Sequence, residues 1–183
     1  MTKLFEEWPE PPTAGDETAA LLGALERQRA TLEWKTGGLD AAGFQRTVGA
    51  SSITLGGLLK HLAFVEAQIF SMKLLGQSPG PPWDTADWEA TPGWDWRSAA
   101  ADSPDELREL WASAVRRSRA VVADTQAEGG LDTPAKGVSW PDGTVPNLRR
   151  LVCDLIEEYG RHVGHADLIR ESIDGLTGED PPA

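Results

Sequence analysis

Four long segments of the chain repeat apolar residues at intervals of three and four, the spacing that places side chains on one face of a helix. The clearest repeat lies in the second segment, at Leu55, Leu58, Leu62, Val65, Ile69 and Met72. Little of the remaining sequence alternates as a strand would. The expected helices span about 16–35, 53–75, 103–128 and 146–174. We therefore predict an all-α fold, a four-helix bundle, in a single domain over residues 1–183.

Capping signals mark where two of these helices begin. Residues 103–106, Ser-Pro-Asp-Glu, combine a serine cap, a proline suited to the first helical position and a glutamate that completes a capping box. Ser51 and Ser52 precede the second helix and are the expected caps there. Gly56 and Gly57 weaken its first turn, so we expect another backbone or a ligand to approach closely at these glycines.

The connection between the second and third helices, residues 76–102, is long and rich in tryptophan. It contains four of the eight tryptophans, namely Trp83, Trp88, Trp94 and Trp96. Four indoles left in water would be a solubility liability, so we expect this connection to be ordered. The simpler interpretation is a cap over one end of the bundle, and the alternative is a lid or wall over a pocket.

The acidic composition argues against two classes of partner. Seventeen Lys and Arg residues against 29 Asp and Glu residues give a net charge of -12, which repels nucleic-acid phosphates and anionic lipid surfaces. Arg116, Arg117 and Arg119 are the best candidate for a basic patch, but a short charged run on a helix is usually a solvated face. We expect no nucleic-acid or membrane partner.

Cysteine content and the lack of long apolar runs bear on the compartment. The single cysteine, Cys153, excludes an internal disulfide and a Cys-rich zinc pattern, and is best interpreted as a filler in a helical segment. No run approaches the roughly 20 apolar residues of a membrane helix, and residues 1–17 lack the apolar core of a secretory signal. These features predict a soluble, cytoplasmic protein.

The fourth helix carries a polar group within its apolar stripe. Between Leu155 and Ile169 the three-four rhythm falls on Glu158, His162 and His165, so all three are predicted to face inward. A carboxylate and imidazoles buried without partners would cost several kcal/mol. These side chains must therefore be paired, neutralised or bound to something.

A divalent metal ion would satisfy these groups together. Glu158 and His162 lie one helical turn apart on one face, and His61 borders the apolar stripe of the second helix. Two histidines and one carboxylate leave a coordination position open, as in catalytic zinc sites, although iron, nickel and manganese also accept such ligands. His165 is then a further ligand or orients one. The alternative is a hydrogen-bonded network in which Glu158 accepts from both histidines and no ion is bound.

Two segments and the stretch between them resemble a known superfamily. SSITLGGLLKHLAFVE (51–66) and LVCDLIEEYGRHVGHADLIRESIDG (151–175), with PPWDTADWE between them, are similar to the DinB-like (YfiT-like) four-helix-bundle superfamily, in particular its DUF664 branch. The resemblance covers nearly the whole chain and implies that His61, Glu158 and His162 hold a divalent metal. Many relatives have histidine at the position of Glu158, whereas mycothiol-dependent maleylpyruvate isomerases have glutamate.

The resemblance also implies a class of reaction. Relatives use the metal with a low-molecular-weight thiol, such as mycothiol or bacillithiol, in S-transfer or isomerisation. We therefore expect a small-molecule substrate, a thiol cosubstrate and most simply zinc. His165, Arg161 and Arg170 are candidates to orient a ligand or face the substrate, although helix arginines near acidic neighbours are more often surface ion pairs.

Two alternatives and the assembly remain open at this point. One alternative is hydrolysis by a metal-bound water. The other is a non-catalytic metal-binding or stress-response protein, which predicts a closed site with His165 as the fourth ligand. Similar bundles are commonly dimers, so a homodimer is the expected assembly.

Overall fold

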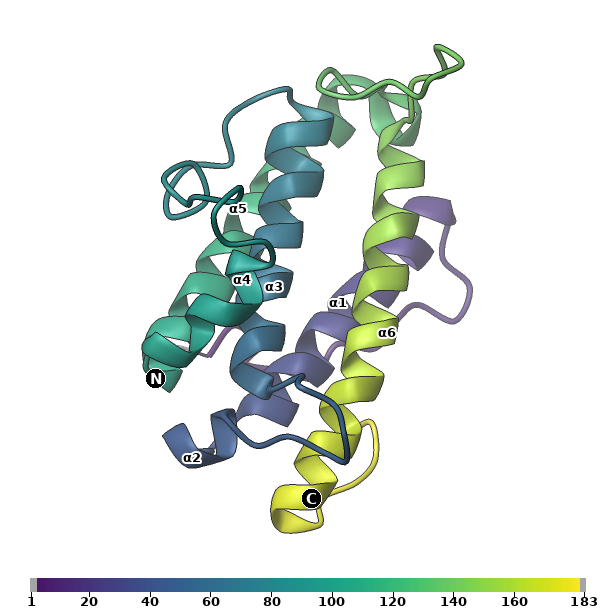
Figure 1. Cartoon of the computed structure of the whole chain (residues 1–183). Coiled ribbons are helices and arrows are strands. Elements are labelled where there is room, and N and C mark those ends of the chain that lie inside the picture. The colour runs from purple at the N-terminus through teal and green to yellow at the C-terminus, as the bar shows by residue number, and fades with distance from the viewer. Residues whose placement is uncertain (1–2, 182–183) are drawn as a thin grey trace.

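Four long helices form the body of the protein, as the apolar spacing predicts. The computed structural model describes residues 3–181, and within them no strand forms (Figure 1). The long helices are α1 (Glu17–Thr36), α3 (Leu55–Ala67), α5 (Pro104–Gly129) and α6 (Leu148–Asp174). Helix α3 continues as a π-helix, η1 (Gln68–Leu74). The short helical elements are α2 (Ala41–Phe44), α4 (Trp94–Arg97), η2 (Ser98–Ala101) and η3 (Gly130–Asp132).

The helix boundaries confirm one capping prediction and correct another. Ser103 caps α5, and Glu106 completes the expected capping box by accepting a hydrogen bond from the Ser103 backbone N–H at 2.8 Å. The predicted caps Ser51 and Ser52 are wrong, because α3 begins at Leu55 and Thr54 caps it. The Thr54 hydroxyl accepts from the Gly57 N–H at 3.0 Å, whereas the Ser51 hydroxyl accepts from Ile53 N–H in the preceding turn.

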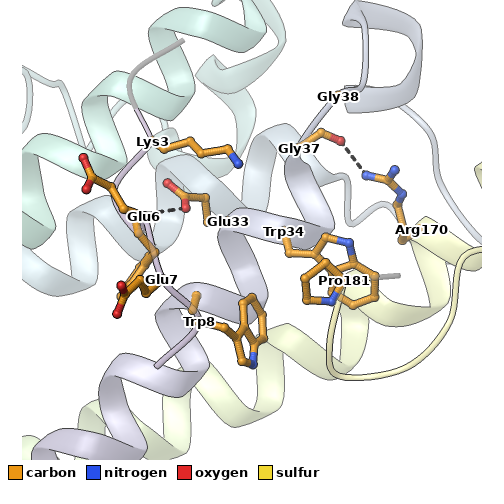
Figure 2. A pocket seen from close by; sticks show the side chains of 12 residues that line it. Lys3, Glu6, Glu7, Trp8, Glu33, Trp34, Gly37, Gly38, Arg170 and Pro181 are labelled. Carbon is orange, nitrogen blue, oxygen red and sulfur yellow. Dashed lines mark hydrogen bonds between the residues drawn. The ribbon is translucent and has the colours of Figure 1, made fainter. Parts of the chain in front are cut away.

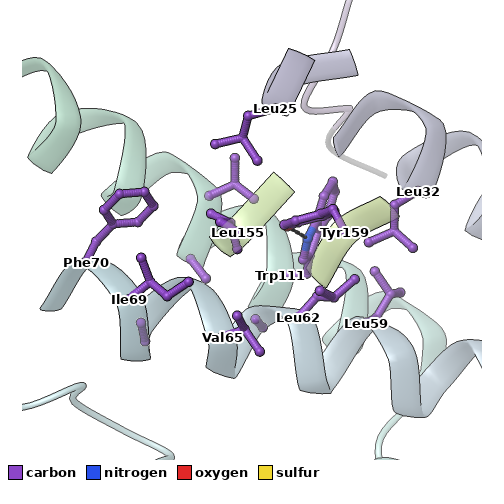
Figure 3. Packing of buried hydrophobic residues seen from close by; sticks show 14 of the residues in the cluster. Leu25, Leu32, Leu59, Leu62, Val65, Ile69, Phe70, Trp111, Leu155 and Tyr159 are labelled. Atoms are coloured by element: carbon purple, nitrogen blue, oxygen red, sulfur yellow. Dashed lines mark hydrogen bonds between the residues drawn. The ribbon is translucent and has the colours of Figure 1, made fainter. Parts of the chain in front are cut away.

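The long helices pack as two pairs around one apolar core. Helix α1 packs along α6, and α3 packs along α5 (Figure 1). Side chains from all four helices meet between the pairs (Figure 3), including Leu25, Leu32, Leu62, Ile69, Phe70, Trp111 and Leu155. Each buried side chain of this size contributes about 1.5–3 kcal/mol by removing apolar surface from water. The core therefore fixes the relative positions of α3 and α6.

Gly56 is approached by protein, which confirms the expectation of close packing at the start of α3. A side-chain carbon at this position would lie 3.4 Å from the Phe44 carbonyl oxygen of α2 and 3.2 Å from a methyl carbon of Leu107. The glycine thus lets α2 and α5 pack against the first turn of α3.

A buried charged group lies at the centre of the bundle. Glu66 on α3 is fully buried, and its two carboxylate oxygens accept hydrogen bonds from the Arg29 guanidinium of α1 at 2.8 and 2.7 Å. The Tyr159 hydroxyl of α6 donates to the same carboxylate at 2.8 Å, and the Trp111 indole N–H of α5 donates to that hydroxyl at 2.8 Å. One network therefore connects all four long helices.

The ionisation of this network follows from its burial. Burial and the neighbouring Glu66 carboxylate raise the pKa of Tyr159 well above its usual value, so the phenol stays protonated and donates. Burial alone would lower the pKa of Arg29, but Glu66 overcomes this effect and raises it. The guanidinium therefore stays charged beside the carboxylate that accepts two of its hydrogen bonds.

The tryptophan-rich connection packs on the flank of the bundle, so the interpretation as an end cap is wrong. Its helical elements α4 and η2 lie against α3 (Figure 1), and Trp83 is buried in the shared core. Lys60 of α3 holds the connection in two ways: its ammonium lies 4.5 Å from the Trp94 ring centroid and forms a salt bridge with Asp102. Because Trp94 and Asp102 both contact Lys60, the connection lies along the side of α3.

Two of the three arginines of the candidate basic patch on α5 are paired with carboxylates. Arg116 pairs with Glu109, and Arg119 pairs with Glu26 of α1. Arg117 donates to the hydroxyl of Ser113 at 3.1 Å. Among the described residues, none of the helices is long and apolar enough to cross a membrane.

The central network predicts an unequal response of two glutamates to substitution. We expect Glu66→Gln to lower the free energy of unfolding by about 3 kcal/mol, because the Arg29 charge loses its buried partner and keeps only Glu26. Glu109→Gln removes a partner from the exposed Arg116 and should cost less than about 1 kcal/mol. Urea unfolding followed by circular dichroism measures both values, and equal losses would contradict the assigned role of Glu66.

Candidate metal centre

The structure brings His61, Glu158 and His162 together between α3 and α6. One potential ligand atom from each residue lies within 4.8 Å of the others. The Glu158 Oε2 atom is 3.3 Å from His162 Nε2, its neighbour one turn along α6, and 3.9 Å from His61 Nε2 of α3. The three residues selected from sequence spacing therefore form one cluster.

The cluster lies at the edge of the bundle, which corrects the predicted inward stripe. The core position on α6 is taken by Tyr159, which is fully buried, whereas the Glu158 side chain is 39% exposed. Steps of four, three and four residues connect Leu155 to Tyr159, His162 and Ala166, so the helical rhythm passes beside Glu158. His162 is buried, and His165 is half-buried. The cluster is therefore open to solvent on the Glu158 side.

His61 is oriented by a carboxylate that sequence spacing did not identify. Asp95 of α4 is buried, and its Oδ2 atom lies 2.7 Å from His61 Nδ1. The Trp96 ring stacks on the His61 ring with centroids 4.3 Å apart and an interplanar angle of 22°. The sequence signal was an acidic residue between two tryptophans, Trp94 and Trp96, in a connection that was expected to be ordered.

His162 contacts His165 through the nitrogen that faces away from Glu158. The two Nδ1 atoms are 3.3 Å apart, so one ring donates to the other. Burial lowers the pKa of His162 to about 4 and the nearby His61 adds to this shift, while Glu158 opposes it. At neutral pH His162 is therefore an uncharged imidazole. If its Nδ1 carries the proton, its Nε2 lone pair points toward Glu158.

The two candidate arginines each pair with a carboxylate on α6. Arg161 is exposed and forms an i,i+4 pair with Glu157 on the solvent side of α6. Arg170 is buried, donates to the Gly37 carbonyl at the end of α1 at 2.7 Å, and pairs with Asp174. It borders a cleft of about 360 Å³ beneath the N-terminal segment (Figure 2), where Trp8 and Trp34 also lie.

The metal-free network would need Glu158 to accept hydrogen bonds from both histidines, and its separation from His61 is too long for one of them. A distance of 3.9 Å between His61 Nε2 and Glu158 Oε2 is beyond hydrogen-bond reach. Ligand atoms bound to tetrahedral zinc at about 2.0–2.2 Å lie roughly 3.4 Å from one another. The observed separations of 3.3 and 3.9 Å are close to that spacing. All three ligand atoms lie within 4.8 Å of one another, so His61, Glu158 and His162 could hold a divalent ion if their side chains moved closer together.

The fold and the cluster define a helical-bundle protein of the DinB-like class with a His-Glu-His group of potential metal ligands. A family model described as mycothiol-S-transferase matches residues 20–175, so the chain belongs to the mycothiol-S-transferase family. The match includes all four long helices except the first residues of α1. A search of curated proteins found no matching sequence.

The low pKa of His162 predicts acid sensitivity in the metal-free protein. The pKa of a histidine in the unfolded chain is about 6.5, whereas in the folded chain that of His162 is about 4. The unfolded state therefore binds the proton first, and we expect the free energy of unfolding to fall as the pH drops through this window. Urea unfolding in the presence of a chelator at each pH measures the slope. His162→Gln lacks the titrating group and should show a smaller slope; identical slopes would contradict the assignment.

Proposed function

We propose that this protein is a metal-dependent transferase that uses a low-molecular-weight thiol of the mycothiol type as cosubstrate. His61, Glu158 and His162 would hold the divalent ion, most simply zinc. The observation that carries the proposal is the convergence of two imidazole Nε2 atoms and one carboxylate oxygen between α3 and α6. Membership of the mycothiol-S-transferase family supports a thiol as the second component.

The three residues would supply different kinds of ligand on the two sides of this site. His61 and His162 supply neutral nitrogen ligands on the buried side, and Glu158 supplies one negative charge on the side that faces solvent. Two histidines and a carboxylate leave a coordination position unfilled by protein. When bound there, zinc would lower the pKa of a thiol and make the thiolate available near neutral pH.

The reacting sulfur would come from the cosubstrate. Cys153 is exposed and lies more than one helical turn from Glu158 on α6, so it does not join the cluster. A single free cysteine and a dependence on a small thiol both fit a reducing cytoplasm.

A closed, non-catalytic metal site is less well supported than an open one. That alternative needs His165 as a fourth ligand, but His165 contacts the Nδ1 atom of His162, on the opposite side of that ring from Glu158. His165 would instead orient His162, as hydrogen-bond partners of metal-bound histidines commonly do.

Metal content should depend on the cluster and on no neighbouring carboxylate. We expect the purified protein to contain about one zinc per chain, and His162→Ala and Glu158→Ala to lose most of it, because two remaining ligands bind zinc weakly. Glu157→Ala is the matched control, since Glu157 pairs with Arg161 on the exposed side of α6. Elemental analysis of the four proteins gives the answer, and equal zinc in all four would end the assignment.

The zinc-loaded protein should consume an electrophile only when the thiol is present. We expect a haloarene to react with mycothiol faster in the presence of the protein, and Glu158→Ala to return the rate to the uncatalysed value. Absorbance of the thioether product measures the reaction. Zinc binding without this activity would favour the non-catalytic alternative, and thiol-independent turnover of an ester would favour hydrolysis.

A further inference from the structure

His61 is the one member of the cluster that comes from α3, so the orientation of its ring decides whether the three residues meet. A neutral imidazole carries one N–H, and whichever nitrogen carries it is unable to bind a metal. Asp95 lies 2.7 Å from Nδ1, and a carboxylate accepts hydrogen bonds but donates none when ionised. Nδ1 must therefore carry the hydrogen, which leaves the Nε2 lone pair directed toward Glu158 and His162.

We propose that Asp95 is a positioning residue that selects this tautomer of His61, and that the tryptophan-rich connection 76–102 serves to hold Asp95 in place. The inference rests on the proposed metal site. It assigns a role to a segment whose tryptophans would otherwise only add apolar surface to the flank of α3.

The plane of the His61 ring is fixed by a second contact from the same segment. Trp96, the residue after Asp95, stacks on His61 at 4.3 Å, and its ring centroid lies 5.5 Å from that of His162. Gly57, one turn before His61, makes room for this indole, because a side-chain carbon there would lie 3.1 Å from the Trp96 ring. The hydrogen bond and the stack together remove both rotational freedoms of the His61 ring.

Helix α4 is itself anchored on both sides of Asp95. Before Asp95, the Lys60 ammonium, from the residue before His61, lies over the Trp94 ring, and within the segment the Ser98 hydroxyl donates to the Trp94 carbonyl at 2.6 Å. Lys60 also pairs with Asp102 where the connection ends. Lys60 of α3 therefore binds the connection to the helix, and the connection in turn fixes the ring of the next residue, His61.

Asp102 provides a matched control for Asp95. Both are carboxylates of the same connection, and each pairs with one of two adjacent residues of α3: Asp102 with Lys60 and Asp95 with His61. Only Asp95 touches the cluster. A role limited to holding the connection on α3 would make the two substitutions equivalent, whereas positioning of His61 would make Asp95 alone affect the metal.

Zinc affinity separates these two roles. We expect Asp95→Asn to bind zinc about 10–100-fold more weakly than the wild type, in the range seen when the hydrogen-bond partner of a metal-bound histidine is removed. Asp102→Asn should stay within about threefold of the wild type. Competition with a chromophoric chelator measures the dissociation constants, and circular dichroism of the metal-free proteins confirms that each is folded. Equal weakening in both variants would overturn the proposal.

The tautomer of His61 gives a readout that needs neither metal nor substitution. In the metal-free wild type at about pH 9, where histidine is ordinarily neutral, long-range proton–nitrogen NMR should show His61 with the hydrogen on Nδ1. A hydrogen on Nε2 would overturn the proposal even if Asp95→Asn proves unable to fold.

His61→Ala distinguishes failure of the proposal from failure of the proposed function. Loss of zinc in His61→Ala, combined with unchanged affinity in Asp95→Asn, would leave the metal site standing and refute the role of Asp95. Unchanged zinc affinity in His61→Ala would refute the metal site and the positioning role together.

Discussion

The contact between the Glu66 carboxylate and Tyr159 sets the register on which the rest of the structure depends. Glu66 lies five residues after His61 on α3, and Tyr159 lies three residues before His162 on α6. The two pairs meet in reverse order, so the helices run antiparallel with this register. A slip of one turn, about 5.4 Å, would separate the carboxylate from the phenol and His61 from His162. The buried network and the candidate site therefore depend on the same register of α3 against α6.

A charged pair at this depth contributes specificity of arrangement more than stability. Removing two ions from water costs several kcal/mol each, and their attraction recovers that cost only with good geometry. The geometry here is bidentate between Arg29 and Glu66, and Tyr159 fills a further acceptor position. Any other rotation of α1 or α3 would leave a buried charge without its partner, and any other rotation of α6 would take the Tyr159 donor away from Glu66. Apolar contacts alone, such as those around Leu62 and Leu155, would tolerate such rotations more easily.

The helical fold and the pair Glu158 and His162 could be predicted because both depend on local spacing, whereas His61 was supported by its place beside the apolar stripe of α3 and by the resemblance to the DinB-like superfamily. Helical periodicity is visible within one segment, and Glu158 and His162 lie four residues apart in the same helix. The direction in which these side chains point was harder to predict. Glu158 and Tyr159 are adjacent, and only packing against α3 decides that Tyr159 enters the core. The wrong caps at Ser51 and Ser52 have a similar origin. Thr54 is equally suited to cap a helix, and the apolar pattern does not show at which residue before Leu55 the helix begins.

The residues that sequence reasoning missed make contacts across long separations. Asp95 meets His61 across 34 positions, and Glu66 meets Tyr159 across 93. Neither contact produces a pattern of regularly spaced residues in the sequence. A signal did exist for Glu66, which follows Leu62 by four residues and so falls on the apolar face of its own helix. A charge at such a position requires a buried partner, and that argument was available from the sequence.

The two sides of the cluster differ in how firmly they are held, and this difference bears on how an ion would reach it. His61 is fixed by Asp95 and Trp96, and His162 is buried against His165. Glu158 has no contact of that kind among the described residues, and 39% of its side chain is exposed. The two nitrogen donors are thus arranged in advance on the protein side, and the partly exposed Glu158 carboxylate lies on the solvent side. An ion would therefore approach from the Glu158 side, where the cluster is open to solvent, and would meet two nitrogen donors that other side chains already hold in position.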